Sequence, residues 1–182
     1  YGMVLVSGTA GSGQSTTQAC ILDRINRTRN CHIITLEDPI EYLHRDQKSI
    51  VSQREIAIDT RDYLSALRSC QRQAPDVILI ATLHTRGAVN TIVRIIDSFP
   101  PAQQAQIRVQ LSSVLRTVVS QQLLPDVDGE QVPAFEVMQM NSAIRSMIRD
   151  GKDHQIDNAI AAGGSEGMLT MDQSILALYQ AG

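Results

Sequence analysis

Apolar runs and helical periodicities alternate along the first two thirds of the chain. Four apolar runs predict strands: Met3–Ser7, Cys31–Leu36, a weaker run that begins at Ile50–Val51, and Asp76–Leu83. Two segments between them have apolar residues at helical spacing: Ser15–Arg29, and a segment from Thr60, the expected N-cap, to about Arg72. Continuous Val, Ile and Leu runs between helices indicate strands covered on both faces, as in a mainly parallel α/β sheet.

The pattern changes after Pro100–Pro101. Its period predicts a helix at Ala102–Val119, then a strand at Val132–Met140, and then three short helices. We therefore expect an α/β core over residues 1–125 and a C-terminal strand and helical extension over residues 126–182.

Local signals mark the ends of the short helices. Asn141 is expected to cap the first of them, and Gly151 is expected to end it. Thr170 and Gln173 have the spacing of a capping box at the start of the last helix. Each signal acts within a single turn of backbone, so it predicts a helix end without knowledge of the tertiary structure.

Composition narrows the class of protein. Hydrophobic residues make up 43% of the 182 residues, which is enough for a core, and we find neither an apolar run that could span a bilayer nor a secretory leader. A net charge of −3 and 3% aromatic residues argue against nucleic-acid binding. The chain has three cysteines, at the widely spaced positions Cys20, Cys31 and Cys70. This number and spacing argue against a disulfide framework or a zinc site and favour free thiols in a reducing cytosol.

A glycine-rich segment joins the first strand to the first helix. It reads Gly8, Thr9, Ala10, Gly11, Ser12, Gly13, Gln14, Ser15 and Thr16. It fits the phosphate-loop pattern G-x-x-x-x-G-K-[ST] at every fixed position except Gln14, which stands where lysine belongs. Glycines allow successive backbone N–H groups to turn toward an anion, and the following helix directs its positive end at the phosphates. Ser15 could bind a phosphate-bound Mg²⁺ through its hydroxyl.

Gln14 lacks the charge that the lysine would place against the phosphates. Two unit charges about 4 Å apart interact by about 4 kcal/mol at an effective dielectric of about 20. We therefore expect weaker nucleotide binding and a larger loss of rate, because that charge stabilises the transition state more than the ground state. The alternative is a glycine-rich strand-to-helix turn that binds nothing.

Three further segments carry a resemblance to a family. His32–Tyr42 resembles the acidic box of the secretion and pilus ATPases, Ala81–Thr85 resembles their histidine box, and Ala143–Arg149 is similar to the AIRNLIR signature of the pilus retraction branch. With the glycine loop, these segments make the chain resemble the C-terminal RecA-like domain of the PilT-type retraction ATPases, within the type II/IV secretion ATPase superfamily.

The resemblance implies a fold, ligands and partners. The fold would be a P-loop NTPase with a mainly parallel sheet and helices on both faces. The ligands would be ATP and Mg²⁺. The partners would be other copies of the chain in a hexameric ring and the pilus machinery of the inner membrane, at its cytoplasmic face. Neither nucleic acid nor direct membrane insertion is expected.

The resemblance also implies roles for particular residues. Gly8–Thr16 would hold the phosphates, and Ser15 would contact the metal. Glu37, Asp38 and Glu41 would organise Mg²⁺ and water, although alone they could be a solvated turn. His84 would contact the nucleotide, and Arg68 or Arg72 would stabilise charge near the phosphates.

The chain departs from the family in three ways. Gln14 is the first. The second is at Ile80–Ala81, where a half-strand, a helix and a further half-strand of the family, with the glutamate that positions the attacking water, are expected to be deleted. An alternative is that the sequence joins residues there that are not neighbours in the molecule. The third expected departure is the absence of the N-terminal domain of the family, and ring assembly by this chain alone is therefore not expected.

These departures leave two hypotheses open. One is a Mg²⁺-dependent P-loop ATPase domain of the retraction type with impaired hydrolysis. The other is a non-catalytic or weakly nucleotide-binding module, degenerate or engineered, that acts through protein contacts. Two roles are also open for Arg145 and Arg149, which lie four residues apart on one edge of a predicted helix. They could belong to an ordinary amphipathic helix, or they could contact a neighbouring subunit.

Overall fold

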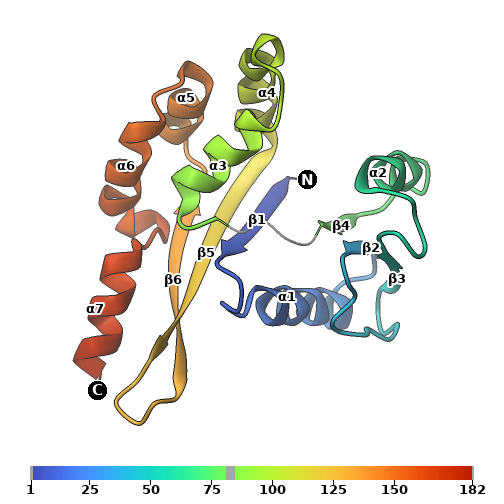
Figure 1. The fold of residues 1–182 in the computed structure, drawn as a ribbon, viewed down its shortest axis with the longest axis horizontal. Coiled ribbons are helices and arrows are strands. Elements are labelled where there is room, and N and C mark those ends of the chain that lie inside the picture. Colours follow the sequence, from blue (N-terminus) through green and yellow to red (C-terminus); the bar gives the residue numbers. More distant parts are fainter. Residues whose placement is uncertain (1, 81–84, 182) are drawn as a thin grey trace. The chain divides into compact units, whose positions relative to one another are not determined.

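The chain divides into two compact units. A computed structural model describes residues 2–80 and 85–181. One unit comprises Tyr1–Gly13 and Leu83–Gly182, and the other comprises Gln14–Thr82. Figure 1 shows the elements of both.

The first unit is built on a sheet with the strand order β1-β5-β6. β1 (Met3–Gly8) pairs in parallel with β5 (Leu115–Pro125), and β5 pairs with β6 (Gln131–Gln139) as an antiparallel hairpin. Ser7, Ser120 and Glu136 are register partners across the three strands. This register brings the end of β1, where the glycine loop begins, next to polar positions of the other two strands.

In its described part, the first unit also contains five α-helices and two short 3₁₀ turns: α3 (Ala88–Asp97), α4 (Pro101–Val114), α5 (Ser142–Asp150), η1 (Asp153–Gln155), α6 (Ile156–Ala162), η2 (Gly164–Glu166) and α7 (Met171–Ala181). Apolar residues of α3, α4, α5 and α6 share one continuous core with β5 and β6, in which Ile92, Ile148 and Ile160 are almost fully buried. In Figure 1, α7 follows the strands of this sheet on the side of β6. Burial of this shared core is the main source of stability for the unit.

The second unit has a smaller sheet in the order β3-β2-β4, with all its strands parallel. Its elements are α1 (Gln14–Thr28), β2 (His32–Glu37), β3 (Ile50–Glu55), α2 (Tyr63–Gln71) and β4 (Val77–Ile80). Ile34 and Leu36 of β2 pack with Ala66 and Cys70 of α2. β2, the central strand, is buried along most of its length, as expected for a strand covered on both faces.

The expected α/β fold is confirmed, and so are most of the local signals. Asn141 caps α5 by accepting a hydrogen bond from the Ile144 N–H, and Gly151 ends this helix in the left-handed conformation. Thr170 and Gln173 exchange the two hydrogen bonds of a capping box at α7.

Two helix boundaries expected from the sequence are wrong. The N-cap of α2 is Asp62, whose carboxylate accepts from the Ser65 N–H at 2.7 Å, and not Thr60. The helix expected over Ala102–Val119 ends at Val114, and the chain continues as β5. Val118 and Val119 pair with β1, which is distant in the sequence, so a long-range pairing overrides the local helical period.

Two other expectations stay predictions. The proposed boundary between residues 125 and 126 falls within the β5–β6 hairpin, so these two strands pair across it. The junction Ile80–Ala81 and the end of the strand expected at Asp76–Leu83 lie partly outside the described residues. Among the helices that are described, none is long and apolar enough to cross a membrane.

Candidate functional site

The glycine loop has a backbone that depends on two of its glycines. Gly11 and Gly13 have φ values of +75° and +80°, which L-residues with a Cβ rarely adopt. Between them, the Ser12 N–H donates to the Thr9 carbonyl at 3.1 Å and closes a turn. A Cβ atom at Gly13 would also lie 3.0 Å from Gln121 Nε2. Backbone conformation therefore favours glycine at both positions, and at Gly13 the end of the Gln121 side chain would also have to move aside.

Ser12 is a buried hydroxyl in the middle of this loop. It is 2% exposed, and its Oγ has no hydrogen-bond partner among the residues that the structure describes. A buried polar group without a protein partner costs free energy, and such a group is often satisfied by a bound ligand or by water. The donor chemistry of the loop thus fits a bound anion.

The first turn of α1 presents hydroxyl groups and no cation. α1 begins at Gln14 and continues through Ser15 and Thr16. The Thr16 hydroxyl lies 2.8 Å from the hydroxyl of Tyr42. Since the helix start carries a partial positive charge, it can attract an anion even without a basic side chain, although more weakly.

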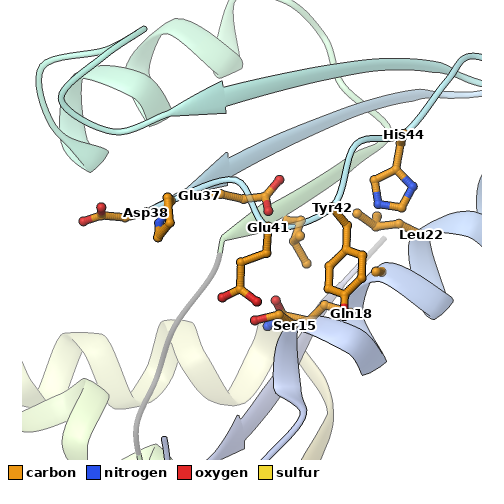
Figure 2. Close-up of a pocket in the computed structure, with 11 residues that line it drawn as sticks. Ser15, Gln18, Leu22, Glu37, Asp38, Glu41, Tyr42 and His44 are labelled. Carbon is orange, nitrogen blue, oxygen red and sulfur yellow. The ribbon is translucent and has the colours of Figure 1, made fainter. Parts of the chain in front are cut away.

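A cleft of the second unit lies between this helix and the segment that follows β2. Its lining consists of Ser15, Gln18, Ala19, Leu22, Glu37, Asp38, Pro39, Glu41, Tyr42, His44 and Leu79. Three of these residues are carboxylates, and the lining contains neither lysine nor arginine. Figure 2 shows the Glu41 side chain extending toward Ser15, whereas Asp38 points away from the cleft. The structure therefore places Glu37 and Glu41 in the lining of the same cleft as Ser15, and their role in binding a metal stays a prediction.

Hydrogen bonds from its own strand and from the neighbouring strand β3 fix the orientation of Glu37. This residue lies at the end of β2 and is 9% exposed. Its Oε1 accepts from the Thr35 hydroxyl at 2.6 Å and from Gln53 Nε2 at 3.1 Å. Burial with two donors is the usual way in which a protein holds a carboxylate in one place.

Gln53 also holds the rest of the acidic segment. Its Nε2 donates to the Tyr42 carbonyl at 2.8 Å, and its Oε1 accepts from the His44 N–H at 2.8 Å. From the same strand, Glu55 Oε2 accepts from the Ile40 N–H at 3.1 Å. β3 therefore positions the segment that carries the carboxylates.

The negative charge of the acidic segment also affects Tyr63, at the start of α2. Tyr63, the first residue of α2, has a raised pKa, first because its hydroxyl is buried and then because Asp38 and Glu37 add negative charge nearby. The anionic form of Tyr63 is disfavoured by both effects. The tyrosine therefore faces the acidic segment as a neutral hydroxyl at ordinary pH.

The carboxylates fit Mg²⁺ only if a ligand completes its coordination. Among the described residues, no group of three or more His, Cys, Asp or Glu side chains is placed to hold a metal ion. Mg²⁺ takes oxygen ligands and is commonly bound through one or two protein groups together with phosphates and water. The Ser15 hydroxyl beside Glu37 and Glu41 fits that pattern.

The other predicted site residues are not brought into the cleft. Arg68 and Arg72, at the end of α2, are exposed and do not contribute to its lining, so their role stays a prediction. His84 lies outside the described residues. Sequence reasoning missed Thr35 and Gln53, because their roles come from hydrogen bonds between side chains of different strand positions and leave no local motif.

Arg145 has a structural partner. Its guanidinium donates to the carbonyls of Ser112, Ser113 and Leu115, at the C-terminal end of α4. A cation at a helix C-terminus binds its last carbonyl groups and stabilises the negative end of the dipole. Ile144 and Ile148 of the same helix are fully buried, which confirms the amphipathic helix. Arg149 is exposed and lies 3.5 Å from Asp150.

Comparisons with known proteins identify relatives of the whole chain. The family model described as "Type II/IV secretion system protein" matches residues 1–81. The type IV pilus retraction ATPase PilT of Pseudomonas aeruginosa is 41% identical over 204 residues, which cover 100% of this chain and 59% of that protein. A twitching motility protein of Neisseria gonorrhoeae is 40% identical over 205 residues, with 100% and 55% covered.

A solved structure has the same fold. The pilus retraction motor PilT, determined with bound ADP, matches with a TM-score of 0.89 at 41% identity, over 100% of this chain and 58% of that one. This match confirms the fold that the sequence predicts. The chain thus spans between half and two thirds of the length of these relatives.

The lengths of the alignments bear on the expected deletion. They extend over 204 and 205 residues and include the whole of this 182-residue chain. The relatives therefore carry residues within the matched range that this chain lacks. The family match ends at residue 81, beside the expected junction Ile80–Ala81. The position of the deletion stays a prediction.

Proposed function

We propose that this chain is a nucleotide-binding motor domain with impaired hydrolysis. The proposal starts from its homology to the PilT-type pilus retraction ATPases of the type II/IV secretion ATPase superfamily. One observation supports this most directly. A glycine-dependent loop leads into a helix whose first turn shares a cleft with three carboxylates.

The loop supplies the phosphate contacts in this proposal. The backbone N–H groups of the loop and the start of α1 would donate to phosphate oxygens. The buried Ser12 hydroxyl, which lacks a partner among the described residues, would donate to the same ligand. Because these donors are already held in place, little entropy would be lost on binding.

The acidic segment supplies the metal contacts. The Ser15 hydroxyl would bind Mg²⁺ directly, and Glu37 and Glu41 would hold its water ligands. A bound Mg²⁺ would neutralise charge on the β- and γ-phosphates. Thr35 and Gln53 would keep Glu37 in position for this role.

Two features weaken catalysis. Gln14 supplies no charge for the transition state at the position where the phosphate-loop pattern has lysine. The segment expected to be deleted at Ile80–Ala81 would have carried the glutamate that positions the attacking water. Glu37 is already hydrogen-bonded to Thr35 and Gln53, so an additional role as general base is not part of this proposal.

A second candidate is a module that binds nucleotide weakly, does not hydrolyse it, and acts through protein contacts. The absence of lysine and arginine from the cleft lining favours it. In either case we propose a place at the cytoplasmic face of the inner membrane, through the pilus machinery and other copies of the chain. The relatives are pilus proteins, which is what supports this assignment.

The substitution Gln14→Lys separates the two candidates. For the motor domain, we expect the phosphate release rate with Mg²⁺-ATP to rise at least about tenfold over the unmodified chain, since about 1.4 kcal/mol of transition-state stabilisation gives that factor. Gln103→Lys, which adds the same charge at an exposed position of α4 outside the cleft lining, is the matched control and should leave the rate unchanged. A flat rate in Gln14→Lys, with nucleotide still bound, would favour the non-catalytic module.

A further inference from the structure

The start of α3 is held by hydrogen bonds from two neighbouring strands. Its N-cap is Gly87, which has φ +82° and no side chain that could cap the helix. The Gly87 N–H donates to the Ser120 hydroxyl at 2.9 Å, and the Ala88 N–H donates to Glu136 Oε1 at 2.6 Å. The first N–H groups of a helix have no partners within it, so β5 and β6 provide them here.

Glu136 caps a second helix as well. It accepts a backbone hydrogen bond from Met171, the first residue of α7. Among the described residues Glu136 forms no ion pair, so the starts of two helices are its partners. Burial raises the pKa of its carboxyl group, and the charges of Asp157 and Asp172 raise it further, whereas the two N–H donors oppose this shift.

A chain of buried hydroxyl groups continues from this point to the glycine loop. The Thr91 hydroxyl, on α3, lies 2.9 Å from Ser7 Oγ, and the Ser7 hydroxyl donates to Ser120 Oγ at 3.2 Å. These three residues are at most 1% exposed. Ser7 immediately precedes Gly8 in the chain. At the other end, the Thr85 hydroxyl lies 2.7 Å from that of Thr91, and Thr85 directly follows His84 in the sequence.

We propose that Glu136 is a positioning residue for the phosphate loop. By holding the first turn of α3, it fixes Thr91 against Ser7 and so determines how the chain leaves β1 at Gly8. A buried polar network in which the members are paired favours a single arrangement of its elements. The effect on nucleotide binding rests on the proposed function, but the order of the loop can be measured without any ligand.

Amide hydrogen exchange of the intact chain tests this proposal. The variants are Glu136→Ala, which removes both caps, and Glu136→Gln, which keeps a carbonyl acceptor for Ala88. A third variant, Thr91→Val, keeps Glu136 and removes the contacts of the Thr91 hydroxyl with Ser7, Thr85 and the Gly87 carbonyl. Glu130→Ala, at an exposed residue next to β6, is the matched control. Exchange is compared among the loop at residues 8–13, the starts of α3 and α7, and the distant helix α5.

We expect Glu136→Ala to raise exchange about fivefold or more in the loop and at both helix starts, since a lost hydrogen bond of about 1 kcal/mol changes a local opening equilibrium by that factor. Thr91→Val should loosen the loop but not α7, and Glu136→Gln should restore most of the protection of the loop. α5 should not change in any variant that remains folded.

The proposal is overturned if the loop keeps its protection in both Glu136→Ala and Thr91→Val. Should Glu136→Ala fail to fold, Thr91→Val decides alone, because it retains both caps and a side chain of similar shape. The proposed function fails separately, if the unmodified chain binds no Mg²⁺-ATP while its loop responds to these variants as expected.

Discussion

The two compact units combine apolar and polar interactions in different proportions. The unit of residues 1–13 and 83–182 has one extended core to which α3, α4, α5 and α6 contribute, with residues such as Ile92 and Ile148 fully buried. The unit of residues 14–82 has a much smaller cluster around Ile34 and Leu36, and its acidic segment is held by hydrogen bonds from β3. The larger core provides stability, whereas the smaller unit carries the carboxylates of the candidate site on the segment that follows β2.

This difference agrees with a general division between scaffold and site. Segments with few buried apolar contacts open more easily, and ligand-binding loops are usually among them. Polar contacts such as those of Gln53 then determine where the carboxylates lie. We therefore expect the first unit to depend mainly on apolar packing and the acidic segment of the second unit to depend mainly on hydrogen bonds.

The largest effect is expected in the core of the first unit. Ile148→Ala should lower the free energy of unfolding by about 2–5 kcal/mol, because it removes buried methylene groups and leaves a cavity. Chemical denaturation followed by circular dichroism measures this. Val109→Ala, at a residue that is 52% exposed, is the control and should change stability by less than about 1 kcal/mol. Equal losses in the two variants would contradict the assignment of the core.

A smaller effect is expected from the polar support of the second unit. Gln53→Ala leaves the Glu37 carboxylate with one donor fewer and removes partners of Tyr42 and His44. We expect a loss of about 1–3 kcal/mol, with faster proteolysis within residues 38–48. Gln47→Ala, an exposed residue in the same segment, should behave like the unmodified chain. Unchanged proteolysis in Gln53→Ala would show that β3 does not position the segment.

The sequence predicted the elements that depend on local signals, but not the contacts between distant residues. Asn141 and Gly151 act within one helical turn, so the bounds of α5 could be predicted. The end of α4 could not, because β5 forms by pairing with β1. The glycine loop and the acidic segment could be found because each matches a sequence motif. Gln53 and Glu136 could not, because they bind partners far along the chain and belong to no motif. The division of the strands into two sheets was not predicted.

Both sheets have an uncharged apolar strand at one end. Among the described residues, β1 ends one sheet and β4 ends the other, and Val4 and Ile78 are partly exposed on them. A deletion at Ile80–Ala81 would remove a strand that could cover such edges, and uncovered edges tend to pair with other chains. We therefore expect concentration-dependent self-association in light scattering.

Charge at these strands should reduce the association. Val4→Lys and Ile78→Lys compare the two sheets directly, and each should lower the associated fraction, because a lysine on an edge strand opposes pairing. Val127→Lys, at an exposed apolar residue outside the strands, is the control. A stable monomer of the unmodified chain at all concentrations would contradict the prediction.

The smallest effect is the pH dependence caused by Glu136. Because folding raises its pKa above 4.5, mainly through burial, the folded state binds this proton more tightly than the unfolded chain. The stabilisation that comes from binding this proton is therefore fully present below the unfolded value of 4.5 and is lost as the pH rises through the raised value. Glu136→Gln should flatten the stability curve in this window, and the exposed Glu130→Gln should not. Parallel curves for Glu136→Gln and the unmodified chain would rule this out.

Calorimetric titration with ATP, in the presence and absence of Mg²⁺, is the most direct test of the proposed nucleotide site. We predict binding by the folded chain that requires Mg²⁺ and that weakens when Ser15 is replaced by alanine, because Ser15 joins the loop to the acidic cleft. No detectable heat at high ATP concentration, from a sample shown to be folded, would contradict the assignment of a nucleotide site to this chain.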